Sequence, residues 1–164
     1  VPRIFSMLNS LTSKIKQCLK LHKGLNIIVS LGNSCRKDDG VGPFIASQLE
    51  PADNLIIIDA GITPENIAEK IIGCNPSYLV FIDAANFNGK PGEVRLIAKS
   101  EISEHMLSTH AFPLKIISEI IESETNAQIR FIGIQPRDTG FGEGLSREVR
   151  RAANKIIRMI KRQL

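Results

Sequence analysis

The sequence predicts an α/β fold, a three-layer α/β/α sandwich with a twisted, mostly parallel five-stranded sheet. Five short runs rich in Ile, Val and Leu alternate with segments of helical periodicity, which is the order of elements in βαβ units. Most of these runs are apolar throughout, as in strands that helices cover on both faces. The chain has 164 residues, the length of one ordinary domain.

The first segment, residues 1–24, is expected to be an amino-terminal amphipathic helix ahead of a domain at 25–164. Apolar residues recur at helical spacing between about residues 2 and 21, and Gly24 ends the pattern. The apolar stripe either packs on the chain's own domain or pairs with a partner helix, and periodicity alone does not decide between them.

The strands and helices of the domain follow from composition and turn chemistry. Residues 93–97 alternate polar and apolar side chains, which is typical of a half-exposed edge strand. Proline or a capping serine or threonine precedes each later helical pattern. The predicted strands are 26–31, 54–59, 78–83, 93–97 and 129–134, and the predicted helix starts are Gly42-Pro43, Thr63-Pro64, Pro113 and Ser146.

Charge and cysteine content narrow the class of protein. The net charge is +4, with basic residues concentrated in both terminal segments and acids in between. No nucleic-acid reader motif accompanies this charge, so two solvated helix faces are favoured over a nucleic-acid or lipid surface. The 3 cysteines form no C-x-x-C pair, and no apolar run approaches the roughly 20 residues of a membrane span. We therefore expect a cytoplasmic protein that neither crosses a membrane nor binds nucleic acid.

Polar side chains follow several of the predicted strands, where ligands bind in parallel sheets. Asp38 and Asp39 lie in the loop after the first strand, Asp83 ends the third, and His110 precedes a helix. One imidazole and two carboxylates suit a divalent transition metal with open positions. Each residue also has a structural explanation, since Asp39 can bind backbone amides and Asp83 or His110 can cap a turn or helix.

Other chemistries fit less well. The glycine-rich loop lacks the spacing of a nucleotide-binding loop, and its paired acids repel phosphate. Cys35 beside His110 would make a nucleophile, but no third group is identified to orient the histidine. Asp59, at the end of the second strand, is expected to brace a loop, and His22 and His105 are expected to be structural.

Five ordered segments between about residues 25 and 160 resemble the [NiFe]-hydrogenase maturation endopeptidases, in particular the hydrogenase-3-type branch. The segments are Gly32-Asn33 to Asp38-Asp39-Gly40-Val-Gly42, Asp59-Ala-Gly61 to Pro64-Glu-Asn66, Asp83-Ala84 to Pro91-Gly-Glu93-Val-Arg95, Thr109-His110 with Pro113-Leu114, and Gly133-Ile-Gln135-Pro136 with Gly140-Phe141.

The resemblance implies a function and a site. The substrate would be a [NiFe]-hydrogenase large-subunit precursor, from which the enzyme removes a C-terminal extension after nickel insertion. Asp39, Asp83 and His110 would contact nickel that the substrate carries, so nickel is not expected as a resident cofactor. Asp39 or Asp38 would serve as general base. The alternative is a non-catalytic nickel-sensing checkpoint or chaperone for the same precursor. Oligomeric state is left open.

Overall fold

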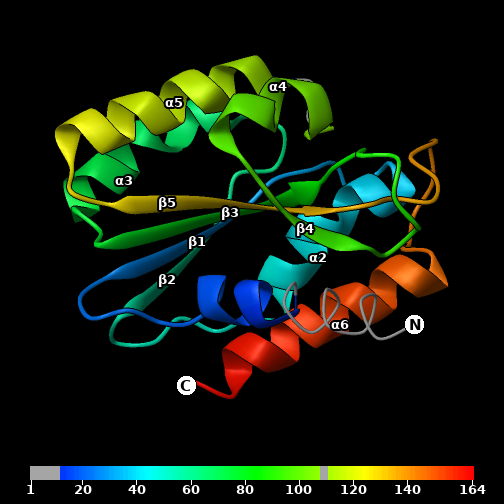
Figure 1. Cartoon of the computed structure of the whole chain (residues 1–164), viewed down its shortest axis with the longest axis horizontal. Helices are drawn as coiled ribbons and strands as arrows, with labels where there is room; N and C mark the ends of the chain where they lie inside the picture. The colour runs from blue at the N-terminus through cyan, green and yellow to red at the C-terminus, as the bar shows by residue number, and fades with distance from the viewer. Residues whose placement is uncertain (1–11, 108–110) are drawn as a thin grey trace.

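The computed structural model describes residues 12–107 and 111–164, without the side chains of residues 111–113. A five-stranded sheet lies between two layers of helices, so the predicted sandwich is confirmed (Figure 1). One layer holds α2 (Val41–Ser47), α6 (Arg147–Lys161) and the helical residues 12–18. The other layer holds α3 (Ala68–Cys74), α4 (Ile102–His105) and α5 (Ala111–Glu124). The 3-10 helices η1 (Lys37–Gly40), η2 (Pro64–Ile67) and η3 (Lys99–Glu101) lead directly into α2, α3 and α4.

The sheet has the strand order β2-β1-β3-β5-β4. Its strands are β1 (Asn26–Ser30), β2 (Leu55–Asp59), β3 (Tyr78–Ala84), β4 (Val94–Ile97) and β5 (Gln128–Ile134). All pairings are parallel except that of β4, which runs antiparallel to β5; its place at the edge of the sheet is the one that its alternating pattern predicts. The predicted strand ends differ from the observed ones by one residue or less. The chain's connections leave β1 and β3 toward opposite sides, so the loops after these two strands meet at a switch point where ligands bind in such sheets.

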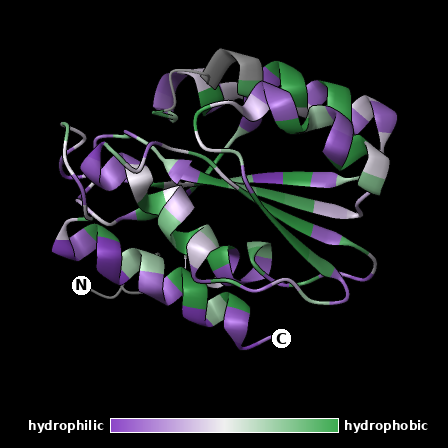
Figure 2. Ribbon diagram, turned by 180° about the vertical axis from the view of Figure 1, so that it is seen from behind, coloured by the Kyte–Doolittle hydropathy of each residue, from purple (hydrophilic) through white to green (hydrophobic). Residues whose placement is uncertain are grey.

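The hydrophobic core has two halves, one on each face of the sheet. Because successive strand residues point to opposite faces, Ile27 packs with α3 and α5 while Ile28 packs with α2 and α6. The strands are mostly hydrophobic, with hydrophilic residues chiefly near their ends, and the helices turn their hydrophilic sides outward (Figure 2). β1 and β3 are buried throughout, which fixes the strand ends that carry the candidate site.

The described part of the amino-terminal segment packs on its own domain. Ile15 and Cys18 are buried in the same core half as α6. The Gln163 amide donates to the Leu19 carbonyl at 2.9 Å and accepts from the Leu21 backbone nitrogen at 2.9 Å. For residues 12–21, the apolar stripe therefore packs on the chain's own domain, the first of the two alternatives that periodicity left open. The rest of the predicted helix lies outside the described residues.

Two predicted capping residues occupy their positions without capping contacts. Thr63 precedes η2, but its hydroxyl donates to the Ala60 carbonyl at 3.4 Å. Ser146 precedes α6, but its hydroxyl donates to Asp38 at 2.9 Å. Within the described residues, no helix combines the length and apolar character that crossing a bilayer requires.

Candidate functional site

The loop after β1 is held tightly against the ends of β1 and β3. The Leu31 backbone nitrogen donates to the Ile82 carbonyl at 2.9 Å. A Cβ atom on Gly42 would lie 2.1 Å from the Leu31 carbonyl oxygen and 2.8 Å from that of Ile82. Only glycine therefore lets α2 begin this close to the sheet, which is the physical reason for a glycine at this point of the loop.

Asp39 lies in η1, within this loop, with 9% of its surface exposed. One carboxylate oxygen accepts the Asn33 backbone N–H at 3.1 Å. Burial raises the pKa of the Asp39 carboxyl, and the Asn33 amide and the Arg36 charge offset this only in part. A poorly solvated carboxyl with a raised pKa is well suited to bind a cation or to take up a proton.

Asp38, its neighbour, is completely buried and fully engaged in hydrogen bonds. Its oxygens accept the backbone N–H of Arg137 (2.8 Å), Asp138 (3.1 Å) and Ser146 (2.6 Å) and the Ser146 hydroxyl (2.9 Å). These donors belong to the loop between β5 and α6. Asp38 thus fixes the loop between β5 and α6 to the loop after β1, which also carries Asp39 and is called the site loop below.

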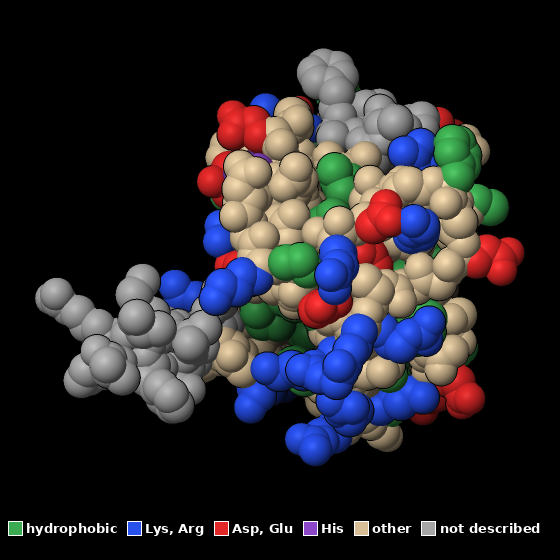
Figure 3. All heavy atoms as spheres, turned by 90° about the vertical axis from the view of Figure 1, so that its right-hand side faces the viewer, with side chains coloured by type: hydrophobic (Ala, Val, Ile, Leu, Met, Phe, Trp, Pro, Cys, Tyr) green, Lys and Arg blue, Asp and Glu red, His purple; other side chains and the backbone are tan. Residues whose placement is uncertain are grey.

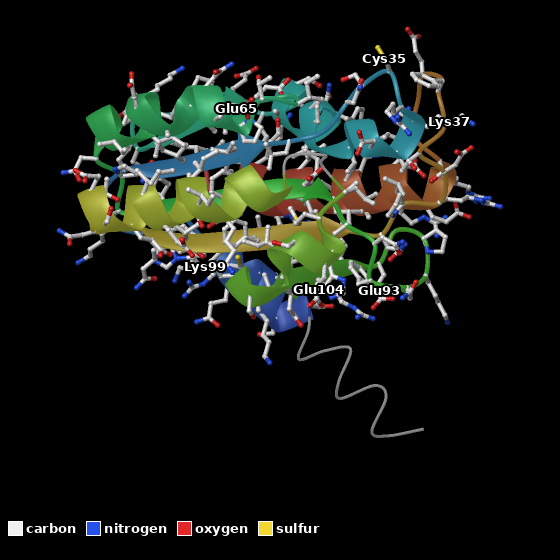
Figure 4. The ribbon with its side chains drawn as sticks, turned by 90° about the horizontal axis from the view of Figure 1, so that it is seen from above. Cys35, Lys37, Glu65, Glu93, Lys99 and Glu104 are labelled. Carbon is white, nitrogen blue, oxygen red and sulfur yellow. The ribbon has the colours of Figure 1, made fainter. Side chains whose placement is uncertain are left out.

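The two loops also pair along their backbones. Lys37 donates its backbone N–H to Gly142 at 2.8 Å, and Gly142 donates to Cys35 at 3.0 Å. The Lys37 ammonium forms an ion pair with Asp138. Figure 4 shows Cys35 and Lys37 at the same end of the molecule, the end at which the parallel strands finish. This pairing was not predicted from the sequence: the glycines of residues 140–144 indicate a tight loop but do not identify its partner.

Asp83 lies at the end of β3 and is completely buried. One of its oxygens accepts the Ala84 backbone N–H at 2.7 Å. The preceding residue, Ile82, is the one whose carbonyl binds Leu31 of the site loop. The structure thus brings Asp83 and the loop of Asp39 to adjacent positions at the switch point of the sheet.

His110, the third predicted metal ligand, lies outside the described residues. Leu107, the last described residue before it, donates its backbone N–H to Ala84 at 3.1 Å, next to Asp83. Among the residues that the structure describes, no group of three or more His, Cys, Asp or Glu side chains could hold a metal ion. Because His110 is not among them, the set of Asp39, Asp83 and His110 stays a prediction.

The remaining residues singled out from the sequence have structural contacts. Asp59 accepts the Ser30 hydroxyl at 2.8 Å and the Gly61 N–H at 3.1 Å, which is the expected bracing of a loop. His22 stacks on Tyr78 with 4.0 Å between ring centroids. His105 lies 3.1 Å from the Asn86 carbonyl oxygen through its Nδ1. Cys35 is exposed on its loop.

Gln135 is a positioning residue that reasoning from residue chemistry did not single out. It follows β5 directly and is 7% exposed. Its carbonyl oxygen accepts the backbone N–H groups of Phe87 (3.0 Å) and Gly89 (3.1 Å), and its amide donates to the Asn86 side chain at 3.2 Å. Gln135 thereby fixes the loop after Asp83. A long amide at the carboxyl end of a buried strand was the signal that could have identified it.

Comparisons with known proteins agree on one family. The family model for the hydrogenase maturation protease HycI matches residues 42–163. The hydrogenase 3 maturation protease of Escherichia coli K12 is 30% identical over 139 residues, which cover 83% of this chain and 88% of that protein. The crystal structure of a [NiFe] hydrogenase maturation protease HycI from Thermococcus kodakarensis is 29% identical, with a TM-score of 0.76, covering 90% of this chain and 98% of that one. The solution structure of an endopeptidase HycI from Escherichia coli is 30% identical, with a TM-score of 0.73, covering 82% and 87%.

The matched region takes in Asp83, His110 and the loop after β5, and the fold agrees over most of each chain. The chain belongs to the hydrogenase maturation protease family and is a peptide-bond hydrolase.

Proposed function

We propose that this chain is the endopeptidase that removes the C-terminal extension of a [NiFe]-hydrogenase large-subunit precursor after nickel insertion. The observation that carries the proposal is the placement of Asp39, poorly solvated and with a raised pKa, in a loop pinned to β3 beside the buried Asp83. The family membership supplies the substrate class. The particular precursor and the cytoplasmic compartment stay predictions.

In the proposed reaction, nickel belongs to the substrate, which brings it to Asp39, Asp83 and His110. The protease and the loaded precursor then share one site, and neither is competent alone. Nickel would polarise the scissile carbonyl or activate a water molecule, the two usual roles of a Lewis-acid ion. This makes cleavage conditional on nickel insertion.

Between the two candidate general bases, the hydrogen bonds favour Asp39. A base needs a free lone pair that can reach a proton at the reacting centre. The Asp38 oxygens already accept four hydrogen bonds and have no solvent exposure. Asp39 has one hydrogen bond from Asn33 and a carboxyl that holds a proton more readily than usual.

The alternative, a non-catalytic nickel-sensing checkpoint, requires binding of the loaded precursor without cleavage. The proteases named among the relatives favour the catalytic function. The test is to incubate nickel-loaded precursor with the wild-type chain and with Asp39→Asn, and to record both precursor mass and binding. We expect the wild type to shorten the precursor, and Asp39→Asn to process it at least about 100-fold more slowly, the scale of losing a general base. Equal processing by both chains would remove Asp39 from the mechanism, and binding without any shortening by the wild type would favour the checkpoint.

A further inference from the structure

A cavity of about 330 Å³ opens directly beside the candidate site. Ser34, Lys37 and Gly40 form part of its wall, so the cavity borders the same loop that carries Asp39. Phe44 of α2 and Leu145 of the loop before α6 supply apolar surface. Arg150 lines the cavity from the first turn of α6. A chain segment seated here would contact both apolar surface and the Arg150 cation.

The Arg150 guanidinium is held in place but not neutralised. It lies 5.1 Å from the centroid of the Phe44 ring, within the range of a cation–π contact. No carboxylate of the described residues forms an ion pair with it. A cation in the first turn of a helix is disfavoured by the helix dipole. The position of Arg150 is therefore not explained by the stability of α6.

The other charged groups of the cavity wall are already engaged. Lys37 forms an ion pair with Asp138. Asp59, which also lines the cavity, accepts hydrogen bonds from the Ser30 hydroxyl and the Gly61 N–H, neutral donors that leave its negative charge in place. α6 is rich in Lys and Arg, and its Glu148 forms an ion pair with Arg137. In the view of Figure 3, Lys and Arg side chains gather in the lower part of the molecule, over α6. Arg150 is thus the cation of the cavity wall that no carboxylate of the described residues pairs, and Asp59 is the carboxylate that a ligand's own acidic group must avoid.

We propose that this cavity is the subsite for the precursor's C-terminal extension and that Arg150 receives a carboxylate of that extension. The inference rests on the proposed function, since the extension is the segment that must lie beside the cleavage site. A guanidinium binds a carboxylate through two parallel N–H···O bonds, which positions a peptide as well as attracting it. The carboxylate is supplied either by the end of the extension or by an Asp or Glu side chain within it.

A binding experiment tests the subsite without requiring catalysis. The probe is a fluorescent synthetic peptide with the sequence of the precursor's extension, titrated with the full-length chain and followed by fluorescence anisotropy. We expect Arg150→Gln to weaken binding on the order of tenfold, the scale of losing one charged hydrogen bond. Arg150→Lys should retain part of the affinity. Arg158→Gln removes the same charge from an exposed position of α6 outside the cavity wall and should change the affinity by less than about twofold.

Peptide variants identify the source of the carboxylate. One peptide ends in an amide, and a second has its Asp and Glu residues replaced by Asn and Gln. The peptide that lacks the bound carboxylate should bind the wild type as weakly as the original peptide binds Arg150→Gln. Its affinity for Arg150→Gln should be no lower than its affinity for the wild type. If Arg150→Gln binds the original peptide as tightly as the wild type does, the subsite is wrong.

Kinetics with the nickel-loaded precursor separate the subsite from the proposed function. Arg150→Gln should raise KM on the order of tenfold and leave kcat nearly unchanged, because it removes binding rather than chemistry. If the wild type cleaves and Arg150→Gln shows the same KM, the subsite fails while the function stands. If the wild type does not cleave but binds the peptide through Arg150, the function fails and the subsite stands.

Discussion

Two neighbouring aspartates show how strongly environment separates identical side chains. Asp38 is buried with four hydrogen-bond donors around it, while Asp39 has one donor and a raised pKa. The donors to Asp38 lie about a hundred positions away along the chain, with sequence separations of 99 to 108 residues. Reasoning from the sequence could place both acids at a ligand-binding edge, but it could not assign them different roles, because those depend on distant backbone atoms.

Asp38→Asn should destabilise the fold. The new amide group presents hydrogens to backbone donors, so at least one buried N–H loses its acceptor. We expect the free energy of unfolding to fall by about 2–4 kcal/mol, with faster hydrogen exchange at the Asp138 and Ser146 amides. Denaturant unfolding measures the first and exchange mass spectrometry the second. Asp53→Asn, on an exposed turn, serves as the control and should change stability by less than about 0.5 kcal/mol. Unchanged stability of Asp38→Asn would mean that these bonds do not hold the loop.

Asp39→Asn, in contrast, should leave the fold stable and should change how its stability depends on pH. The folded state raises the pKa of the Asp39 carboxyl above its unfolded value, chiefly through burial. The folded state therefore binds more protons than the unfolded one near that pKa, and this group's contribution to stability grows as pH falls. Above both the folded and the unfolded pKa of this carboxyl, its contribution to stability is smallest, so Asp39→Asn should be at least as stable as the wild type there, and its advantage should shrink as pH falls. Unfolding curves at several pH values check this, and a variant less stable at neutral pH would contradict it.

At the scale of elements, the strands were predictable and the loop pairing was not. Each β strand is read from a local run such as residues 78–83, whose burial follows from composition. The pairing of the site loop with the loop before α6 involves Lys37 and Gly142, about a hundred residues apart. Turn chemistry predicts that each loop bends, but nothing local predicts that the two bends meet. The same limit applies to Gln135, whose partners lie in a third loop.

The start of α2 gives the sharpest prediction at this scale. Gly42→Ala places a methyl group 2.1 Å from the Leu31 carbonyl oxygen, so α2 or the sheet must shift. We expect a loss of about 1–3 kcal/mol or more in the free energy of unfolding, as for other overpacked sites. Gly73→Ala is the matched control, because a Cβ there meets nothing within 4 Å inside α3. It should gain about 0.5–1 kcal/mol from helix propensity. Equal stabilities of Gly42→Ala and Gly73→Ala in denaturant unfolding would refute the close approach of α2 to the ends of β1 and β3.

At the scale of the whole molecule, residues 12–18 and α6 form one structural unit. Residues 12–18 pack on α6, and Lys16, Lys20 and Arg162 line a common cavity. The sequence shows two separate basic termini, and the fold brings Lys16 and Lys20 of the described amino-terminal residues beside Arg162. Periodicity could not predict this, because an apolar stripe does not specify its partner.

Ile15→Ala tests whether the amino-terminal segment is part of the core. Ile15 is 7% exposed and belongs to the core half that contains α6. Removing its side chain should lower the free energy of unfolding by about 2–4 kcal/mol, as in other buried large-to-small substitutions. Lys16→Ala, on the exposed side of the same helix, should cost less than about 0.5 kcal/mol in the same denaturant experiment. If Ile15→Ala and Lys16→Ala both changed the free energy of unfolding only slightly, the amino-terminal segment would lie outside the cooperative fold.

The central claim is that Asp39, Asp83 and His110 cut the precursor only when it brings its own nickel. The most direct measurement is the mass of the hydrogenase large-subunit precursor after incubation with the full-length chain, once with nickel inserted and once without. Loss of the C-terminal extension from the nickel-loaded precursor alone is the predicted result. Equal shortening of the nickel-free precursor, or shortening of the loaded one by Asp83→Asn and His110→Ala at wild-type rates, would contradict it.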